Sequence, residues 1–344
     1  MSPPPASAAS PVCSVVIPSY NGRPLLEICL ASIARHRLDQ PPIEVIVADD
    51  ASSDDTAEWL ARTHPDVRLL RLGRNGGFCL AANAGIAEAR GLYVQLLNND
   101  TEVTRGWIEA GLAPFADPLV GSVAPLVLVR SDPTRVDSAG DSYSWVGWPS
   151  KRGHGQSAQR WLEHPSDPVF GASGSSAFYR TEALRDVGAL DPSFGSYYED
   201  VDLAFRLRWA GYGCVFTPAC QILHEVSASY DHGRPALQRR MSRNAEILFW
   251  SDLPKRWLAA ALVPHLLFTI TQGLWRGLRG RARPFLLGKL DALKELPSLR
   301  RRRRVRVHLA RRAAASPHFP IRFGLFEDAR NHLLRPREAS SRPR

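Results

Sequence analysis

The chain has 344 residues, which is enough for one large domain or two of ordinary size. With 44% hydrophobic and 23% charged residues, its composition is typical of a soluble globular protein with a substantial core. The five cysteines include no C-x-x-C pair. Their odd number and wide spacing argue against a disulfide framework or a zinc knuckle and predict buried thiols in a reducing compartment.

Charge is distributed unevenly along the chain, whose net charge is +10. Residues 231–344 contain 26 Lys and Arg against 8 Asp and Glu, whereas residues 1–230 contain 18 against 26. This asymmetry predicts two roles, and a basic tail can meet nucleic acid, anionic lipid or another acidic surface. Residues 1–11 lack the basic and apolar regions of a signal peptide, so we expect a disordered leader there.

Strand and helix patterns alternate in the front part of the chain. Short apolar runs predict strands at 13–19, 43–50, 67–73 and 91–100. Helical spacing and a capping Ser53 predict helices at 24–37, 53–64 and 76–90. This alternation is typical of βαβ units in a doubly wound, mostly parallel sheet. Ligands of such sheets bind beyond the carboxyl ends of the strands, where this sequence places the polar loops PSYNG, DDASSDD, GRNGG and NND.

The pattern loosens after Thr101. Residues 120–129 form another apolar run and predict a strand. Residues 131–168, rich in Gly, Ser, Pro and Trp, indicate a long insertion or lid. An acidic cluster then precedes a predicted helix at 203–210, which Gly211 ends.

Acidic side chains gather in three loops that we expect at one edge of the sheet: Asp49 and Asp50, then Asp100, then Glu199, Asp200 and Asp202. The last group alone is equally compatible with a helix N-terminus, where carboxylates are stabilised by the dipole. Three such loops together are costly unless a cation or donors offset the repulsion. A divalent Mg²⁺ or Mn²⁺ that bridges a diphosphate would do so, because these ions prefer oxygen ligands.

Glycines open the helix predicted at 76–90. Gly76 and Gly77 allow close backbone approach, and a helix N-terminus can face phosphate. The first strand, however, is followed by PSYNG and not by G-x-G-x-x-G, which weakens a dinucleotide-dependent dehydrogenase as an interpretation.

Seven motifs in order resemble those of inverting family 2 glycosyltransferases with the GT-A fold, and most closely the bacterial rhamnosyltransferase type. They are VVIPSYN, VADDASSDDT, RNGGFCLAANAGI, LLNND, GASGSSAFYRTEAL, LDPSFGSYYEDVDLAFRLRWAGY and HEVSAS. The resemblance covers about residues 12–250. It implies an α/β GT-A fold, in which a Rossmann-like nucleotide-binding half joins an acceptor-binding half.

The resemblance also implies a set of nucleotide-binding residues. They are Pro18, Ser19, Tyr20, Asn21 and Asp49 for base and ribose, then Arg74, Asn75 and Gly77, and finally Asn98 and Asn99. LLNND stands where the family has D-x-D, with Asn98 in place of the first Asp. A metal would therefore depend on Asp100, with His224 of LHEVS as a second ligand, although a lone histidine after a strand is more often structural.

For catalysis, the resemblance places the family's E-D pair at Glu199 and Asp200, with Asp200 as the general base. Gly174, Ser175 and Asp202 would meet donor sugar and acceptor, and Arg206 would brace the acidic cluster. A sugar hydroxyl needs such a base because it is a poor nucleophile at neutral pH. Its direct attack displaces the nucleoside diphosphate and inverts the anomeric carbon.

The C-terminal part suggests attachment to a membrane surface. Residues 257–275 are apolar with Trp at both ends, leucines recur on one face of 285–296, and RRRRRVRV occupies 300–307. We therefore predict a helical, basic, membrane-associating region at 251–310 and a basic tail at 311–344. A packed helical subdomain and a true membrane span remain alternatives, and the Arg run lacks the aromatic residues of a nucleic-acid module.

Together these features predict a cytoplasmic enzyme on the inner face of the membrane. It would transfer a sugar from a nucleotide-diphosphate donor to a surface-glycan or glycolipid acceptor, with rhamnose on a thymidine or uridine diphosphate suggested by family likeness. Two rival interpretations are a noncatalytic nucleotide-sugar-binding or assembly protein, which Asn98 favours, and a metal phosphohydrolase.

Overall fold

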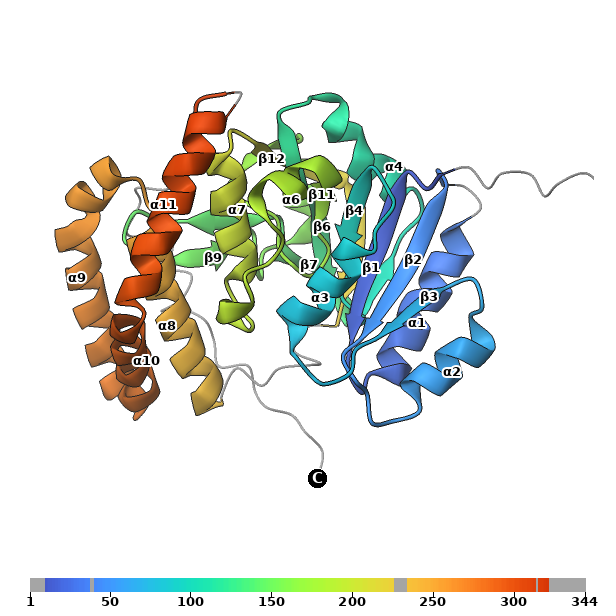
Figure 1. The fold of residues 1–344 in the computed structure, drawn as a ribbon, viewed down its shortest axis with the longest axis horizontal. Coiled ribbons are helices and arrows are strands. Elements are labelled where there is room, and N and C mark those ends of the chain that lie inside the picture. The colour runs from blue at the N-terminus through green and yellow to red at the C-terminus, as the bar shows by residue number, and fades with distance from the viewer. Residues whose placement is uncertain (1–9, 38–39, 226–233, 314, 322–344) are drawn as a thin grey trace, which may run out of the picture.

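The computed structural model describes residues 10–37, 40–225, 234–313 and 315–321. A mixed sheet forms its centre, with helices on both faces and a group of C-terminal helices at one end (Figure 1). Its strands are β1 (Cys13–Ser19), β2 (Ile43–Asp49), β3 (Arg68–Arg71), β4 (Tyr93–Leu96), β5 (Thr101–Val103), β6 (Val120–Val129), β7 (Asp132–Ser138), β10 (Asp167–Val169), β11 (Phe178–Arg180) and β12 (Gly213–His224). A separate small sheet pairs β8 (Asp141–Tyr143) with β9 (Pro149–Lys151).

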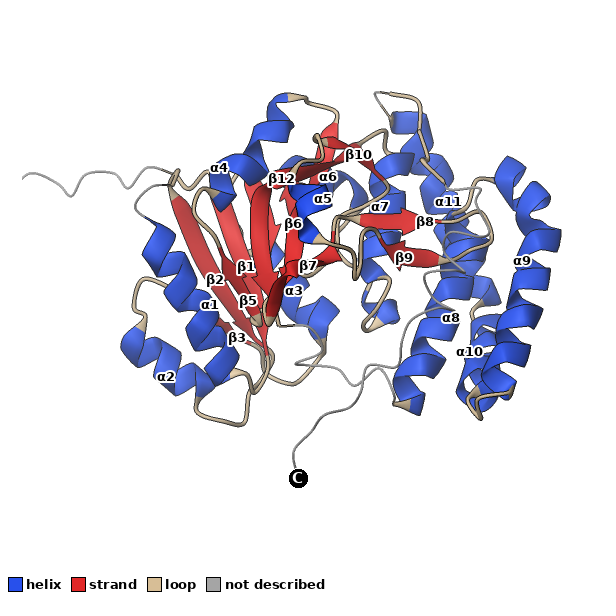
Figure 2. Ribbon diagram, turned by 180° about the vertical axis from the view of Figure 1, so that it is seen from behind, coloured by secondary structure: helices blue, strands red, loops and turns tan. Residues whose placement is uncertain are grey.

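The strand order is β10-β12-β6-β11-β4-β1-β2-β3. Strands β4, β1, β2 and β3 pair in parallel, which confirms the predicted doubly wound half, and β11 joins antiparallel between β4 and β6. Helices α1 (Arg23–His36), α2 (Thr56–Thr63) and α4 (Trp107–Leu112) cover one face. Helices α3 (Phe78–Ala87), α6 (Thr181–Val187) and α7 (Glu199–Trp209) cover the other (Figures 1 and 2).

Alternation along β1 explains the two layers. Val15 and Ile17 pack on the first face and Val16 on the second, and all three are fully buried. Side chains of a strand point alternately to opposite faces, so a run apolar throughout needs cover on both.

Three predicted elements differ from the structure. Helix α2 begins at Thr56 and not at Ser53: the Ser53 side chain contacts Asn21 and does not cap the helix, and the Thr56 backbone N–H donates to Asp54 Oδ1 at 3.1 Å in the turn before it. Helix α7 begins at Glu199 and not at residue 203, so the acidic cluster forms its first turn, where the helix dipole favours carboxylates. Residues 131–168 are not a structureless lid, since they contain β7, β8, β9 and the short helix α5 (Ala158–Leu162).

The C-terminal helices are α8 (Pro235–Asp252), α9 (Lys255–Gly277), α10 (Ala282–Lys294) and α11 (Leu296–Arg312). The predicted boundary at residue 250 falls inside α8, and α8 packs on α7, α10 and α11. Gly288 of α10 lies so close to α8 that an added Cβ would be 2.3 Å from the Arg239 carbonyl oxygen. Most of the predicted tail at 311–344 lies outside the described residues, as do residues 1–9 of the leader.

Candidate active site

A cavity of about 2130 Å³ opens beyond the carboxyl ends of β1, β2 and β4. Loops after these strands line one end, the 131–168 segment and the start of α7 line the middle, and α8, α9 and α10 line the far end. The predicted residues that line it are Pro18, Ser19, Tyr20, Asn21, Asn75, Gly77, Asn98, Asn99, Asp100, Gly174, Ser175, Glu199, Asp200 and His224. The structure therefore brings most of the predicted site together.

The loop after β1 is ordered by its own polar side chains. Asn21 has a φ of 47°, and its Oδ1 accepts a hydrogen bond of 2.8 Å from the Ser53 backbone N–H. Asn99 Nδ2 donates to Ser19 Oγ at 3.2 Å. These contacts tie the three polar loops after β1, β2 and β4 to one another.

Asp49 and Arg74 differ from the other predicted nucleotide ligands. Asp49 is fully buried below the cavity and accepts from the Ser52 hydroxyl, with the Arg71 guanidinium 3.6 Å away. Arg74 is exposed and is not among the lining residues. Asp50 lines the cavity instead, and it accepts from the backbone N–H groups of Gly76 and Gly77, each at 2.7 Å.

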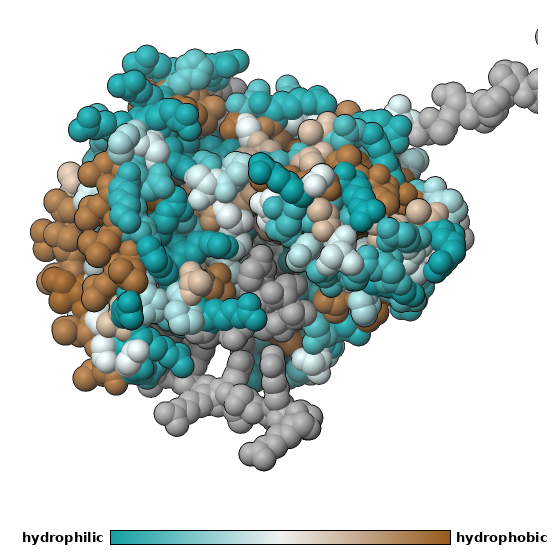
Figure 3. Space-filling view, turned by 60° about the horizontal axis from the view of Figure 1, so that its bottom comes forward, coloured by the Kyte–Doolittle hydropathy of each residue, from teal (hydrophilic) through white to brown (hydrophobic). Residues whose placement is uncertain are grey.

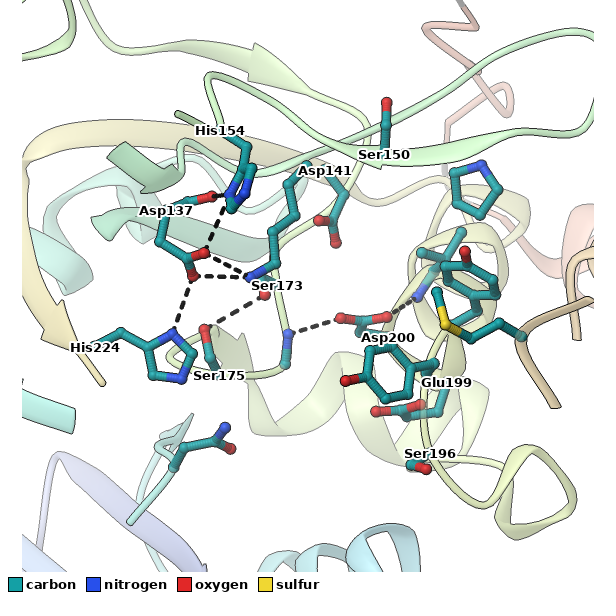
Figure 4. Close-up of a pocket in the computed structure, with 18 of the residues that line it drawn as sticks. Asp137, Asp141, Ser150, His154, Ser173, Ser175, Ser196, Glu199, Asp200 and His224 are labelled. Carbon is teal, nitrogen blue, oxygen red and sulfur yellow. Dashed lines mark hydrogen bonds and ion pairs between the residues drawn. The ribbon is translucent and has the colours of Figure 1, made fainter. Parts of the chain in front are cut away.

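Asp100 and His224 meet because β5 pairs antiparallel with the end of β12. His224 Nε2 lies 3.3 Å from Asp100 Oδ1, and His224 Nδ1 lies 3.0 Å from Asp137 Oδ2 (Figure 4). Burial lowers the pKa of His224, but its hydrogen bonds to Asp100 and Asp137 outweigh burial and raise this pKa to about 9.

Asp137 was not predicted, although it lies at the centre of this cluster. Its buried carboxylate also accepts from Lys151 Nζ at 2.8 and 3.0 Å and lies 3.2 Å from His154 Nδ1 (Figure 4). Burial raises the pKa of Asp137, but Lys151, His154 and His224 together hold it well below its usual range. The only sequence signal was an isolated Asp in a segment without a recognised motif.

The Asp100–His224 pair suits a hard or borderline divalent cation, which takes carboxylate oxygen and imidazole nitrogen. Asp137 holds His224 by Nδ1 and leaves Nε2 directed toward Asp100, as outer carboxylates orient metal-ligating histidines. Among the described residues, no group of three or more His, Cys, Asp or Glu side chains could hold a metal ion by itself.

Asp200 lies in the middle of the cavity at the start of α7 (Figure 4). Its Oδ2 accepts from the Gly174 backbone N–H at 2.9 Å, and its Oδ1 accepts from that of Val201 at 2.8 Å. Burial raises the pKa of Asp200 although these two donors lower it. The pKa values of Glu199 and of Asp141, which sequence reasoning missed, are well above their usual range because of burial and the neighbouring charge of Asp200.

The turn before α7 has an uncommon backbone. Tyr197 and Tyr198 have φ values of 69° and 73°, a region that side-chain-bearing residues rarely adopt. Asn244 of α8 is fully buried, and its Nδ2 donates to the carbonyl of Tyr197 at 2.8 Å and to that of Phe194 at 3.0 Å. A C-terminal helix thus holds the turn that presents Glu199 and Asp200, and such strain is typical of functional sites.

Asp202 does not reach the cavity, in contrast to its predicted contact with sugar. It is fully buried on the opposite side of α7, where Arg206 Nε donates to it at 2.8 Å. Arg302 and Arg306 of α11 contact its other oxygen. Asp202 therefore anchors α11, and Arg206 braces this cluster as expected.

The fold and the site together define the class of protein. It is an α/β protein whose parallel half has the arrangement of a nucleotide-binding domain, with a carboxylate at the start of a helix and a carboxylate–histidine pair in one cavity. Comparison with known proteins identifies the family. The model of the family described as "Glycosyl transferase family 2" matches residues 14–188. Over 272 residues the chain is 30% identical to the N-acetylglucosaminyl-diphospho-decaprenol L-rhamnosyltransferase of Mycobacterium tuberculosis (strain ATCC 25618 / H37Rv), covering 73% of this chain and 88% of that protein.

Two solved structures share the fold. GalNAc-T7 with UDP, GalNAc and Mn²⁺ superposes with a TM-score of 0.56 and 18% identity, covering 70% of this chain and 48% of that one. The mannosyltransferase PcManGT from Pyrobaculum calidifontis, in complex with GDP-Man and Mn²⁺, superposes with a TM-score of 0.51 and 20% sequence identity. The match covers 86% of this chain and 90% of that one. The chain belongs to glycosyl transferase family 2, and it is a glycosyltransferase with the predicted fold.

Proposed function

We propose that this glycosyltransferase inverts the anomeric carbon of a nucleotide-diphosphate sugar, with Asp200 as the general base. The observation that supports this most is the fixed carboxylate of Asp200. Two backbone N–H groups hold it inside the cavity whose other end is lined by the loops after β1, β2 and β4. A base must lie within hydrogen-bond reach of the hydroxyl whose proton it takes, and a fixed carboxylate satisfies this at little entropic cost.

The step itself needs few groups. The acceptor hydroxyl attacks the anomeric carbon, the bond to the diphosphate oxygen breaks, and the hydroxyl proton moves to Asp200. The raised pKa of Asp200 strengthens it as a base, because a carboxylate with a higher pKa holds the proton more firmly. Burial and the neighbouring charge of Asp200 raise the pKa values of Glu199 and Asp141 well above their usual range, which disfavours further negative charge beside Asp200.

Asp100 and His224 would hold a divalent metal, Mn²⁺ or Mg²⁺, on the donor diphosphate. Such an ion would stabilise the charge that develops on the leaving group. Asn98 replaces the first acid of the family motif, so this chain supplies one carboxylate from that loop. Support comes from the geometry of Asp100, His224 and Asp137 and from the two solved structures of the same fold, both of which are complexes with Mn²⁺.

For the substrates, we propose L-rhamnose from a thymidine or uridine diphosphate donor and a lipid-linked glycan acceptor. The support is the name of the relative from M. tuberculosis, which acts as a rhamnosyltransferase on a diphospho-decaprenol-linked sugar. The five unpaired, buried cysteines agree with a reducing, cytoplasmic compartment.

We further propose that α9 and α10 lie on the surface of an anionic bilayer. Helix α9 is long and apolar enough to cross a membrane by length and composition, and only 11% of its most apolar window is buried. It exposes Leu266, Leu267, Ile270 and Leu274, and hydrophobic side chains gather over this side of the molecule (Figure 3). Contiguous exposed apolar surface marks an interaction site. The turn between α9 and α10 carries exposed arginines, which favours an anionic lipid surface as the partner.

The catalytic proposal is tested by calorimetric binding of dTDP, UDP and GDP, each with Mn²⁺ or with EDTA, together with assays of sugar transfer. We expect one nucleotide to bind in a metal-dependent manner and Asp100→Ala to lose this binding. Asp200→Asn should abolish transfer and leave nucleotide binding intact. An equal loss of both by Asp200→Asn would refute its role as base, and transfer that persists in this variant would do the same.

The membrane proposal is tested by sedimentation with phosphatidylglycerol vesicles. Replacing Ile270 by Glu should reduce the bound fraction severalfold, because it places a charge in the centre of the apolar surface. Leu119→Glu, a change at another exposed apolar residue that lies outside α9 and α10, should bind as wild type. Equal binding of both variants would show that α9 does not contact lipid.

A further inference from the structure

The polar and apolar sides of α9 are reversed relative to a helix of a water-soluble protein. Thr269, Gln272 and Arg276 are spaced so that they share one side, and all three line the catalytic cavity. The opposite side carries exposed leucines and isoleucine. An amphipathic helix in water normally buries its apolar side, so the polar side of α9 requires a polar partner within the cavity.

Three buried polar atoms on this inner side lack a partner. Thr269 Oγ1, Gln272 Oε1 and Arg276 Nε are inaccessible to solvent and have no hydrogen-bond partner among the described residues. Buried polar groups in folded proteins are nearly always paired, and each exception calls for an explanation. The three atoms are closed off in this conformation, but their side chains are only partly buried and line one cavity, so a polar ligand there supplies the missing contacts once these side chains turn toward it.

The charge of this site is positive. Arg276 is half-buried and packs on the ring of Phe285, with 5.1 Å from its guanidinium carbon to the ring centre. Burial lowers the pKa of Arg276, Tyr198 raises it, and the charge of Arg281 at the cavity mouth lowers it further. No carboxylate of the described residues forms an ion pair with Arg276. A desolvated guanidinium without an anion is unfavourable, and guanidinium groups recognise phosphate well.

The position of the site assigns it to the acceptor. The nucleotide end of the cavity lies at the loops after β1, β2 and β4, whereas Arg276 lies at the α9 end, near Tyr198. Tyr198 directly precedes Glu199 and Asp200 in the chain. A molecule that presents its hydroxyl to Asp200 from the side away from the nucleotide would therefore extend toward α9, whose outer side is apolar.

We propose that Thr269, Gln272 and Arg276 form a subsite for the phosphate or diphosphate of a lipid-linked acceptor, whose lipid chain leaves toward the apolar side of α9 and α10. This inference rests on the proposed function, since it names the chemistry of the acceptor. Arg276 would pair with the phosphate oxygens, the hydroxyl of Thr269 would donate to them, and the amide of Gln272 would hydrogen-bond the adjoining sugar.

The experiment measures binding of decyl diphosphate, below its micellar concentration, to protein saturated with its nucleotide and Mn²⁺. Saturation prevents the diphosphate probe from entering the nucleotide site. We expect Arg276→Gln to weaken this binding at least tenfold, Thr269→Val to weaken it severalfold, and Arg276→Lys to restore part of the loss. Arg283→Gln is the matched control, because Arg283 is exposed on α10 outside the cavity, and it should bind as wild type.

Two further probes separate the sources of the anion. If inorganic pyrophosphate binds as tightly as decyl diphosphate and depends equally on Arg276, the site serves a free anion and the lipid assignment is wrong. If Arg276→Gln lowers binding to phosphatidylglycerol vesicles as strongly as it lowers binding of decyl diphosphate, Arg276 recognises membrane headgroups and the subsite is refuted. Unchanged decyl diphosphate binding in Arg276→Gln refutes it as well.

Failure of this inference is distinguishable from failure of the proposed function. Wild-type protein that binds no nucleotide would overturn the function itself. Normal nucleotide binding and transfer, together with decyl diphosphate binding that is indifferent to Arg276, would overturn the subsite alone. Nucleotide affinity that stays unchanged in Arg276→Gln also shows that the variant is folded.

Discussion

Replacing Asp137 by Asn is expected to weaken metal binding without touching a metal ligand. Asp137 is fully buried and accepts from His224 Nδ1 at 3.0 Å and from Lys151 Nζ at 2.8 Å. Asn keeps the size of the side chain but removes its charge and turns one acceptor into a donor. Changes to the carboxylate partner of a metal-bound histidine typically cost about 10–100-fold in metal affinity, and we expect this range.

The same change should also destabilise the fold moderately. Removing one partner of a buried ion pair costs about 3–5 kcal/mol. The side chain of Lys151 is 37% exposed, so water can solvate its ammonium, and we reduce the expected cost to about 1–2 kcal/mol. Urea unfolding of the metal-free protein measures this loss of stability separately from the loss of metal affinity.

The assay is a calorimetric titration of Mn²⁺ into the nucleotide-bound protein, with Lys151→Met as the matched variant. Lys151→Met removes the other charge of the pair but leaves the Asp137–His224 contact in place. Its Mn²⁺ affinity should therefore stay within a few-fold of wild type. An unchanged affinity in folded Asp137→Asn, or an equal loss in both variants, would refute the view that Asp137 acts by orienting His224.

Three other predictions follow from buried groups. Because no proton transfer is assigned to Asp141, whose pKa is raised well above its usual range by burial and the charge of Asp200, Asp141→Asn should lower turnover less than tenfold, whereas Asp200→Asn should lower it about 10²–10⁴-fold; equal losses would contradict this difference in roles. Burial raises the pKa of Glu246, but its imidazole and ammonium partners lower it to about 2 from 4.5. The ionised Glu246 therefore stabilises the folded protein by on the order of 3 kcal/mol above its unfolded pKa, and this stabilisation is lost as pH falls from about 4.5 toward 2. The free energy of urea unfolding of Glu246→Gln should depend less on pH in that window than that of wild type. An unaltered pH dependence would argue against this pairing. Gly288→Ala should lower the free energy of unfolding by about 1–3 kcal/mol in thermal unfolding, because its Cβ would be 2.3 Å from the Arg239 carbonyl oxygen. An unchanged stability would show that α10 is not firmly docked on α8.

The fold of the front half was predictable because its signals are local. Short, mostly apolar runs such as 13–19 and 43–50, which alternate with helical patterns, predict strands buried on both faces, and the polar loops after parallel strands meet at one edge of the sheet. The ends of elements were less predictable. Ser53 has the chemistry of a helix cap, but its hydroxyl donates to Asn21, which is distant in the chain, and α2 starts at Thr56.

The candidate site was predicted where residues belong to a recognised motif and missed where they do not. Asp100, Asp200 and His224 came from motifs, and the structure places all three in the cavity. Asp137 and Asp141 were missed because they lie in the 131–168 segment, whose pattern indicates only loop. Their importance comes from contacts across the fold, such as that between Asp137 and His224, and no local spacing encodes these contacts.

The basic C-terminal region shows why charge alone cannot assign a surface. The run at 300–307 suggested attachment to lipid, yet Arg302 and Arg306 are buried and pair with acids of the catalytic domain. Arg306 Nε lies 2.6 Å from Asp252 Oδ1, and its Nη2 contacts Asp202. Helical periodicity brings these two arginines to one side of α11 while their neighbours stay more exposed, so the same run both docks the helix and leaves charge outside.

This docking makes the C-terminal helices part of the enzyme's site. Helix α11 is fixed to α7 through Asp202, α8 holds the turn before α7 through Asn244, and α9 closes the far end of the cavity. The start of α7 carries Asp200, so its position depends on contacts from two helices beyond the region that the family model matches. The cavity is therefore built by both parts of the chain: the loops after the strands line one end, and the C-terminal helices line the other and support the turn before Asp200. A change in α8 or α11 would therefore affect catalysis as well as acceptor binding, because both helices help to set the position of Asp200.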